Sequence, residues 1–124
     1  MSDEATGGVV VLTEPISLTR LQAMAADGFG DFVKGVVDVE RRILAVGGDL
    51  HSDSESALLE TGSLQSDLWG INLFPAHFGE DGWVEYDSLI NIRPGEGNRS
   101  RGVEDAHIRQ VVLEVVNELV AGGA

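Results

Sequence analysis

The chain has 124 residues, of which 21 are acidic and 8 are lysine or arginine, so its net charge is −13 at neutral pH. A surface this acidic repels the nucleic-acid backbone and anionic membranes, and we expect neither as a partner. The absence of cysteine excludes disulfides, thiolate metal centres and cysteine nucleophiles.

The sequence favours a cytoplasmic protein. No apolar run reaches the roughly 18–20 residues that cross a bilayer, and Met1–Glu4 carries acids where a signal peptide has basic residues. Lys34 is the single lysine of the chain. An acidic, lysine-poor composition fits a high-salt cytoplasm, where self-repulsion is screened, and equally a GC-rich genome that favours arginine codons.

Hydrophobic residues make up 43% of the sequence, which is typical of a folded domain. We expect one domain over residues 8–121, with a disordered tail at 1–7 and a frayed tail at 122–124. No internal repeat or linker divides the chain further.

The first half of the chain predicts three strands and one helix. The β-branched run at 8–12 predicts a strand, and Ser17 is a suitable N-cap for the helix that follows. Residues 33–40 and 43–46 predict two further strands, with Arg41-Arg42 at the bend between them.

The second half predicts three more strands and a closing helix. We expect a strand at 56–60, because residues 61–63 have turn chemistry, and two others at 68–74 and 83–93. Apolar residues then repeat every three or four positions, which predicts an amphipathic helix. These positions are Ile108, Val111, Val112, Val115 and Leu119.

The order of elements predicts an α+β domain. Short connections favour a mainly antiparallel sheet of about five or six strands, because parallel pairing needs long crossovers. Two helices packed on one face would bury one side of this sheet. The open face would then meet water, a ligand or a second copy of the chain in a homodimer.

Alternation in the predicted strands places several polar residues on one face of the sheet. Such a face is more often simply solvated, and we favour that interpretation. If the face is instead a site, its carboxylates supply acid–base chemistry, and a histidine adds a base. The weak catalytic candidates are Asp38, Glu40, Asp87 and His51, with Asn91 and Arg93 on the same face to orient a substrate.

An arginine- and glycine-rich loop at 93–102 is the strongest local signal for binding. Three of the few basic residues fall within nine positions of an acidic chain, and guanidinium groups fork onto carboxylate or phosphate. Glu96, Glu104 and Asp105 are close enough in sequence to neutralise them, so for the loop by itself we favour a salt-bridged structural loop or a subunit contact over anion binding. The expected ligand-binding residues are Asn91, Arg93, Asn98, Arg99, Ser100 and Arg101.

Residues 48–53 (GDLHSD) place two carboxylates and an imidazole at alternate positions. This spacing matches neither an EF-hand loop nor the helical histidine pair of a metalloprotease. We interpret the segment as a polar turn and expect neither a metal nor an organic cofactor.

Three segments carry a resemblance to a known family. They are VVDVERRILAVGGDLHSD at 36–53, DLWGINLFP at 67–75 and YDSLINIRPGEGNRSRGVED at 86–105. With them the chain resembles an uncharacterised family of small prokaryotic proteins, catalogued as a domain of unknown function. The resemblance implies a small α+β domain and supplies no reaction, cofactor or catalytic residue.

Three functions are therefore carried forward. The first is a binding domain that holds an anionic small molecule or an acidic protein segment through Arg93, Arg99 and Arg101. The second is a structural or interaction module that acts as a homodimer through its open sheet face. The third is a small hydrolase or transferase that uses the carboxylates of that face.

Overall fold

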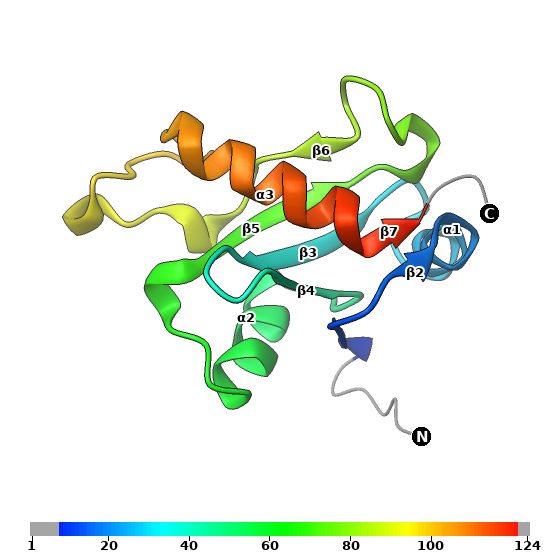
Figure 1. Ribbon diagram of the computed structural model, residues 1–124, viewed down its shortest axis with the longest axis horizontal. Coiled ribbons are helices and arrows are strands. Elements are labelled where there is room, and N and C mark those ends of the chain that lie inside the picture. Colours follow the sequence, from blue (N-terminus) through cyan, green and yellow to red (C-terminus); the bar gives the residue numbers. More distant parts are fainter. Residues whose placement is uncertain (1–7, 122–124) are drawn as a thin grey trace.

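The computed structural model describes residues 8–121, and a five-stranded antiparallel sheet is its centre (Figure 1). The strands lie in the order β1-β4-β3-β5-β6. The tails expected at 1–7 and 122–124 lie outside the described residues. The strand bounds are Val10–Leu12 (β1), Val33–Asp38 (β3), Ile43–Val46 (β4), Leu68–Leu73 (β5) and Val84–Glu85 (β6).

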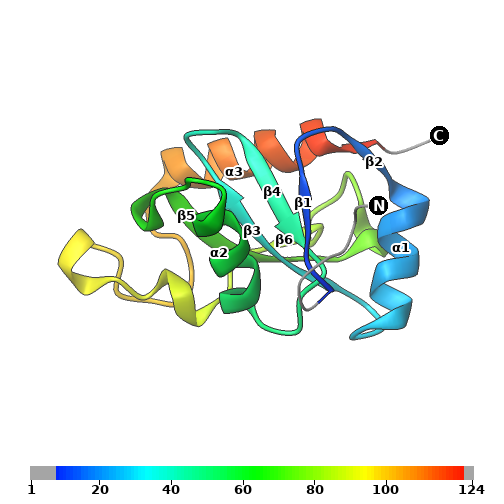
Figure 2. The ribbon, with the colours of Figure 1, turned by 90° about the horizontal axis from the view of Figure 1, so that it is seen from below.

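Three helices surround the sheet. They are α1 (Leu18–Asp27), α2 (His51–Glu60) and α3 (Ala106–Leu119). Helix α3 runs along one face, α2 lies against the opposite face, and α1 stands at one end (Figures 1 and 2). The predicted α+β class and mainly antiparallel sheet are confirmed. The predicted pair of helices on one face is not, because α1 stands at one end of the sheet beside α3, and a helix that was not predicted, α2, packs against the opposite face (Figures 1 and 2).

A short parallel pair joins the two ends of the fold. Strands β2 (Ile16–Ser17) and β7 (Val120–Ala121) pair directly before α1 and directly after α3. As predicted, Ser17 is the N-cap of α1, and its hydroxyl accepts a hydrogen bond from the Arg20 backbone N–H at 3.0 Å.

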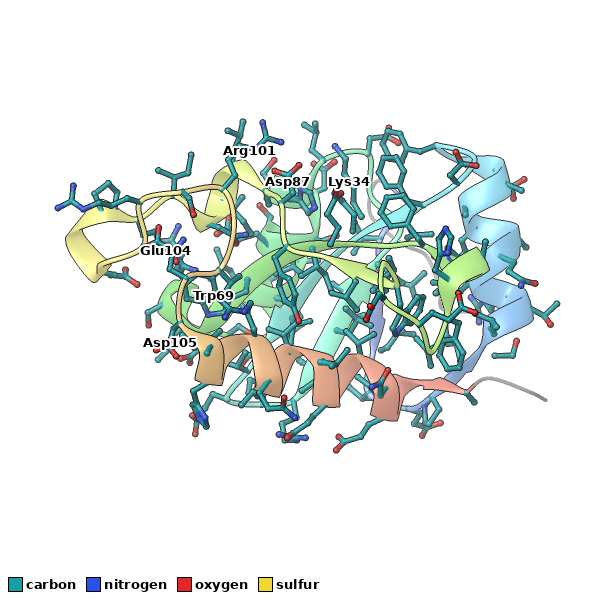
Figure 3. All side chains as sticks on the ribbon, turned by 90° about the horizontal axis from the view of Figure 1, so that it is seen from above. Lys34, Trp69, Asp87, Arg101, Glu104 and Asp105 are labelled. Carbon is teal, nitrogen blue, oxygen red and sulfur yellow. The ribbon has the colours of Figure 1, made fainter. Side chains whose placement is uncertain are left out.

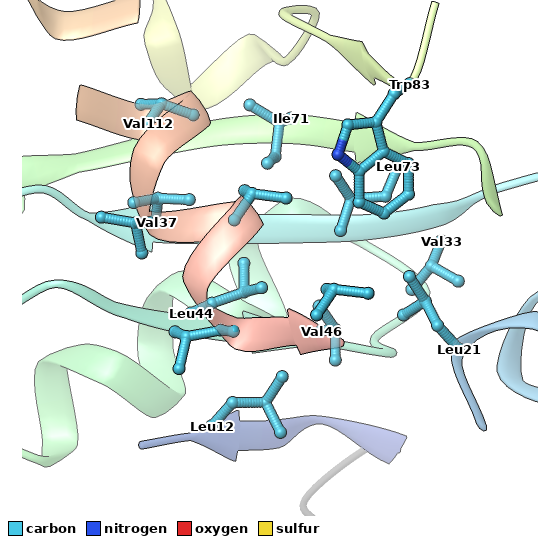
Figure 4. Packing of buried hydrophobic residues seen from close by; sticks show 14 of the residues in the cluster. Leu12, Leu21, Val33, Val37, Leu44, Val46, Ile71, Leu73, Trp83 and Val112 are labelled. Carbon is cyan, nitrogen blue, oxygen red and sulfur yellow. The ribbon is translucent and has the colours of Figure 1, made fainter. Parts of the chain in front are cut away.

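The larger hydrophobic core lies between the sheet and α3 (Figure 4). Strand residues that point to this face pack against the apolar stripe of α3. Leu21 of α1 belongs to the same core and covers the end of the core where α1 lies. Trp83 is 2% exposed, and its ring packs edge-on against Phe78. Members of this core include Leu12, Val37, Leu44, Val46, Ile71, Leu73, Val112, Val115 and Val116.

The smaller core lies between the sheet and α2. Leu58 of α2 is fully buried and belongs to one cluster with Val36, Leu68 and Ala45. These strand residues alternate with those of the larger core, so both faces of the central strands are apolar over most of their length.

Two predicted strands are wrong. Residues 56–60 belong to α2, whose first turn is closed by the Asp53 carboxylate accepting from the Leu50 backbone N–H at 3.2 Å. The segment 83–93 pairs with the sheet only as β6, forms a 3₁₀ turn at Leu89–Asn91, and ends in a bridge between Arg93 and Asn98. The alternation of this segment therefore reflects contact with the sheet edge and not a continuous strand.

The other predicted strands correspond to β1, β3, β4 and β5. Arg42 at the predicted bend has a φ of 57°, the left-handed conformation that tight hairpins demand. Over residues 8–121, no helix is long and apolar enough to span a bilayer.

A substitution at Gly70 measures how tightly Ser88 and the 3₁₀ turn after it pack on β5. A Cβ added at Gly70 would lie 2.5 Å from the Ser88 Cβ, so Gly70→Ala forces the two backbones apart. We expect a loss of about 1–3 kcal/mol in the free energy of unfolding, measured by chemical denaturation. Gly95→Ala is the matched control, because a Cβ there meets nothing within 4 Å, and its effect should stay within about 0.5 kcal/mol. Equal effects of the two variants would contradict the close approach.

Candidate functional site

The register of three strands aligns a row of polar residues on the α2 face of the sheet. Lys34 of β3 pairs with Asn72 of β5, and Asn72 pairs in turn with Glu85 of β6. Directly opposed residues in antiparallel strands point to the same face. The three side chains therefore form one row across the sheet, beside the first turn of α2.

A cavity of about 590 Å³ opens above this row. Its walls come from the start of α2, from strands β3, β5 and β6, and from the segment that follows β6. Figure 3 shows Lys34, Asp87 and Arg101 along this edge of the molecule. The lining residues are Phe32, Lys34, Leu50, His51, Ser52, Asn72, Glu85, Asp87, Ser88, Leu89, Ile90 and Arg101.

Lys34 is the most unusual charge in the cavity. Its ammonium lies 5.0 Å from the centre of the Phe29 ring, a cation–π contact. Within residues 8–121 no carboxylate lies within ion-pair distance of it, although acids outnumber bases in the chain by 21 to 8. Among these residues, no ion pair occupies the ammonium group.

Arg101 enters the cavity from the arginine- and glycine-rich loop. Its Nε donates to the Asp87 carboxylate at 2.6 Å, in a pair that is exposed to solvent. The two terminal nitrogens of its guanidinium have no partner among the described residues. Arg101 is thus oriented by Asp87 and still has donors to offer.

His51 contributes a neutral imidazole. Its Nε2 lies 2.9 Å from the Ile71 carbonyl oxygen, and since a carbonyl only accepts, Nε2 carries the hydrogen and Nδ1 is an acceptor. Burial lowers the pKa of His51 below its usual value, and the positive charge of Lys34 lowers this pKa further. The nearby Asn72 amide acts in the opposite direction.

Asn72 has one half of its amide satisfied. Its Nδ2 donates to the Glu85 carboxylate at 2.8 Å, which fixes the orientation of the amide because a carboxylate only accepts. The residue is 8% exposed. Its Oδ1 is buried and has no hydrogen-bond partner in the part of the chain that the structure describes.

Asn91, just before the arginine- and glycine-rich loop, and two residues of the loop itself are held by the fold. Asn91 is fully buried, and its amide bonds both the N–H and the carbonyl of Gly70, so it continues the sheet as a strand would. Asn98 donates to the carbonyls of Asn91, Ser100 and Gly102. Arg93 stacks on Trp69 at 4.0 Å and donates to the carbonyls of Gln65 and Leu68 at 2.7 and 2.6 Å.

The rest of the loop closes on Glu104, at the start of α3 (Figure 3). The Glu104 carboxylate accepts from the backbone N–H groups of Arg99 and Ser100 at 2.8 and 3.0 Å, which lower its pKa. The Arg99 side chain is exposed and has no hydrogen bond or ion pair over residues 8–121. Of the six residues expected to bind a ligand, Arg101 alone lines the cavity.

The four weak catalytic candidates separate into two pairs. His51 and Asp87 line the cavity, whereas Asp38 and Glu40 lie at the β3–β4 hairpin. Asp38 is fully buried, where it accepts from Ser63 Oγ at 2.6 Å and from the Glu40 backbone N–H at 2.9 Å. These bonds give Asp38 a role in the hairpin and in its attachment to the end of α2.

The sequence analysis missed Lys34, Asn72 and Glu85. Only the pairing register could have found them, since they come from strands that are far apart in sequence.

Residues 48–53 form the start of α2 and the turn before it, and no group of three histidine or acidic side chains suited to a metal occurs in the described residues.

Asn98→Ala tests the structural role of the loop. The change leaves three buried or half-buried carbonyls and the Glu104 backbone N–H without their partner. We expect the free energy of unfolding to fall by about 2 kcal/mol or more. Arg99→Ala in the same loop is the control and should change stability by less than about 0.5 kcal/mol. A stable Asn98→Ala variant would show that the loop does not depend on this amide.

The pKa of His51 predicts a pH dependence of stability. The unfolded chain takes up a proton on this residue near pH 6.5, and the folded chain does so only at lower pH. Between these two values the unfolded state binds more protons, so the free energy of unfolding falls as the pH falls through this interval. An NMR titration of the His51 ring should give a midpoint below 6.5, and a midpoint at or above 6.5 would contradict the buried, neutral imidazole.

Comparison with known proteins gives a family and no function. A family model described as "Protein of unknown function (DUF5674)" matches residues 10–119, in agreement with the resemblance seen in the sequence. Neither a curated protein nor a solved structure matches the chain.

Proposed function

Because the chain belongs to DUF5674, a family of proteins of unknown function, we propose its function from the cavity alone: it binds a small molecule through an anionic group. The site is the cavity between the first turn of α2 and the polar row of the sheet. Carboxylate and phosphate are the anionic groups that this site suits.

Lys34 is the observation that carries this proposal. Over residues 8–121 Lys34 has no ion-pair partner, and unlike Arg99, which shares this property, it lines a cavity large enough for a metabolite. Lysine binds phosphate or carboxylate as a compact point charge. An anion that takes the place of water beside Lys34 would gain from the low dielectric of a partly enclosed site.

Arg101 supports the proposal from the opposite wall. The ion pair with Asp87 uses Nε and leaves the terminal nitrogens, which form the fork that recognises carboxylate or phosphate. The binding role expected for the arginine- and glycine-rich loop is thereby kept, with Arg101 as its contributor. Arg93 and Arg99 are outside the cavity.

A titration with anions tests this proposal. Inorganic phosphate and a panel of small carboxylic acids should shift the NMR signals of the backbone amides of residues 51–53 and 85–89. Lys34→Met keeps the aliphatic stem and removes the charge, and Arg101→Gln removes the fork. Since hydrogen bonds to charged groups contribute about 1.5–3 kcal/mol, each variant should weaken binding about tenfold or more.

Arg99→Gln is the matched control for that titration. It removes the same charge from the same loop, outside the cavity, so affinity should stay within about twofold of the unmodified protein. Equal losses in Arg99→Gln and Arg101→Gln would show that only the overall charge matters. Shifts confined to residues 93–100 would place the anion in the loop and overturn the proposal.

The other two expected functions stay predictions. His51 and Asp87 lie in the same cavity and would serve as base and acid, yet no contact in the structure defines a reaction. A homodimer would need the α2 side of the sheet, where exposed apolar side chains accompany the helix. These side chains are Leu50, Leu59, Leu64, Leu89 and Ile92.

A further inference from the structure

We infer that the ligand of this cavity is a small zwitterion, a molecule with an amino group and a carboxylate or phosphate. This inference rests on the proposed function and adds the chemical class of the ligand. The hydrogen-bond acceptors of the cavity point to this class, whereas its donors suit the anionic group.

The charges of the lining residues balance. Lys34 and Arg101 carry two positive charges, and Glu85 and Asp87 carry two negative charges. A ligand with only an anionic group would satisfy the first pair and would bring a negative charge close to the second. A ligand that also carries an ammonium group can place opposite charges beside both pairs.

Two acceptors of the lining residues have no donor within residues 8–121. One is Asn72 Oδ1, which is buried and has no partner within the described residues. The other is His51 Nδ1, because Nε2 donates to Ile71, and the Asn72 amide lies close enough to this ring to favour its protonated form. Of the two, Asn72 Oδ1 is buried, where a missing donor is costly, and an ammonium group supplies three N–H donors in one place.

Glu85 places a carboxylate at the same point. It already accepts from Asn72 Nδ2 at 2.8 Å, so it both holds the amide in this orientation and adds negative charge next to Oδ1. The row across the sheet therefore has a positive end at Lys34, a neutral acceptor at Asn72 and a negative end at Glu85. A bound zwitterion would lie along this row, with its anionic group toward Lys34 and its amino group toward Glu85.

Matched ligand pairs test the inference. Affinities are measured by NMR titration for phosphoethanolamine against ethyl phosphate, and for L-glutamate against glutarate. Each pair keeps the acid and differs in the amine. We expect the amine of at least one pair to increase affinity about tenfold or more, as a charged hydrogen-bonding group does in a partly buried site.

Two variants locate the effect. Asn72→Leu preserves the volume of the side chain and removes the acceptor, and Glu85→Gln, at an exposed position, removes the charge with the fold retained. Both should reduce the preference for the amine to about twofold or less while ethyl phosphate still binds. Should Asn72→Leu fail to fold, Glu85→Gln decides the result alone.

The outcomes separate the inference from the proposed function. If acids bind in the cavity and their amine analogues bind no better, the zwitterion is wrong and the anion site stands. If the amines bind better but equally so in Glu85→Gln, the amino group lies elsewhere and the inference is overturned. If no member of either pair shifts the signals of the cavity, both the inference and the proposed function are wrong.

Discussion

The account depends on one constraint, the register between β3, β5 and β6. Pairing of Lys34 with Asn72, and of Asn72 with Glu85, brings a cation, an amide and a carboxylate onto one face of the sheet. A shift of one residue in this register would turn each side chain to the α3 face, which is the larger hydrophobic core. The apolar residues that alternate with the row, among them Leu73, therefore hold the polar residues in place.

The start of helix α2 forms one wall of the cavity above this row. The buried residues of α2, above all Leu58, cover the apolar part of the same face and end the hydrophobic layer before the row begins. His51 begins the helix and is tied by its ring to the Ile71 carbonyl. The arginine- and glycine-rich loop closes another side, because Asn91 and Asn98 fix its backbone and leave Arg101 at the edge.

Much of the fold could be predicted from the sequence, because local signals dominate it. The β-branched runs of β3 and β4, the Ser17 cap and the apolar stripe of α3 are periodic or have specific capping chemistry. The prediction of a strand at 56–60 was wrong because polar residues of α2, such as Ser54 and Ser56, interrupt the apolar periodicity that indicates a helix. The helix depends on its packing against the sheet, which the local sequence does not show. The segment after β6 failed because Asn91 takes the place of a strand with a side chain.

Less of the site could be predicted. The arginine- and glycine-rich loop could be identified in the sequence because basic residues are rare. Its charges did not indicate which arginine would donate its hydrogen bonds to backbone carbonyls. The Arg93 guanidinium donates hydrogen bonds to the carbonyls of Gln65 and Leu68, and no local sequence pattern predicts these contacts. Lys34 stood out as the single lysine, but its place in the lining of the cavity, without an ion-pair partner among the described residues, is visible only in the three-dimensional arrangement.

The most direct measurement of the central claim is a crystal structure of the chain soaked with phosphoethanolamine. We expect density for the phosphate within hydrogen-bond distance of Lys34 Nζ, and density for the amine beside Asn72 and Glu85. Density for the ligand against Arg93 or Arg99, with the cavity above the polar row left to water, would contradict it.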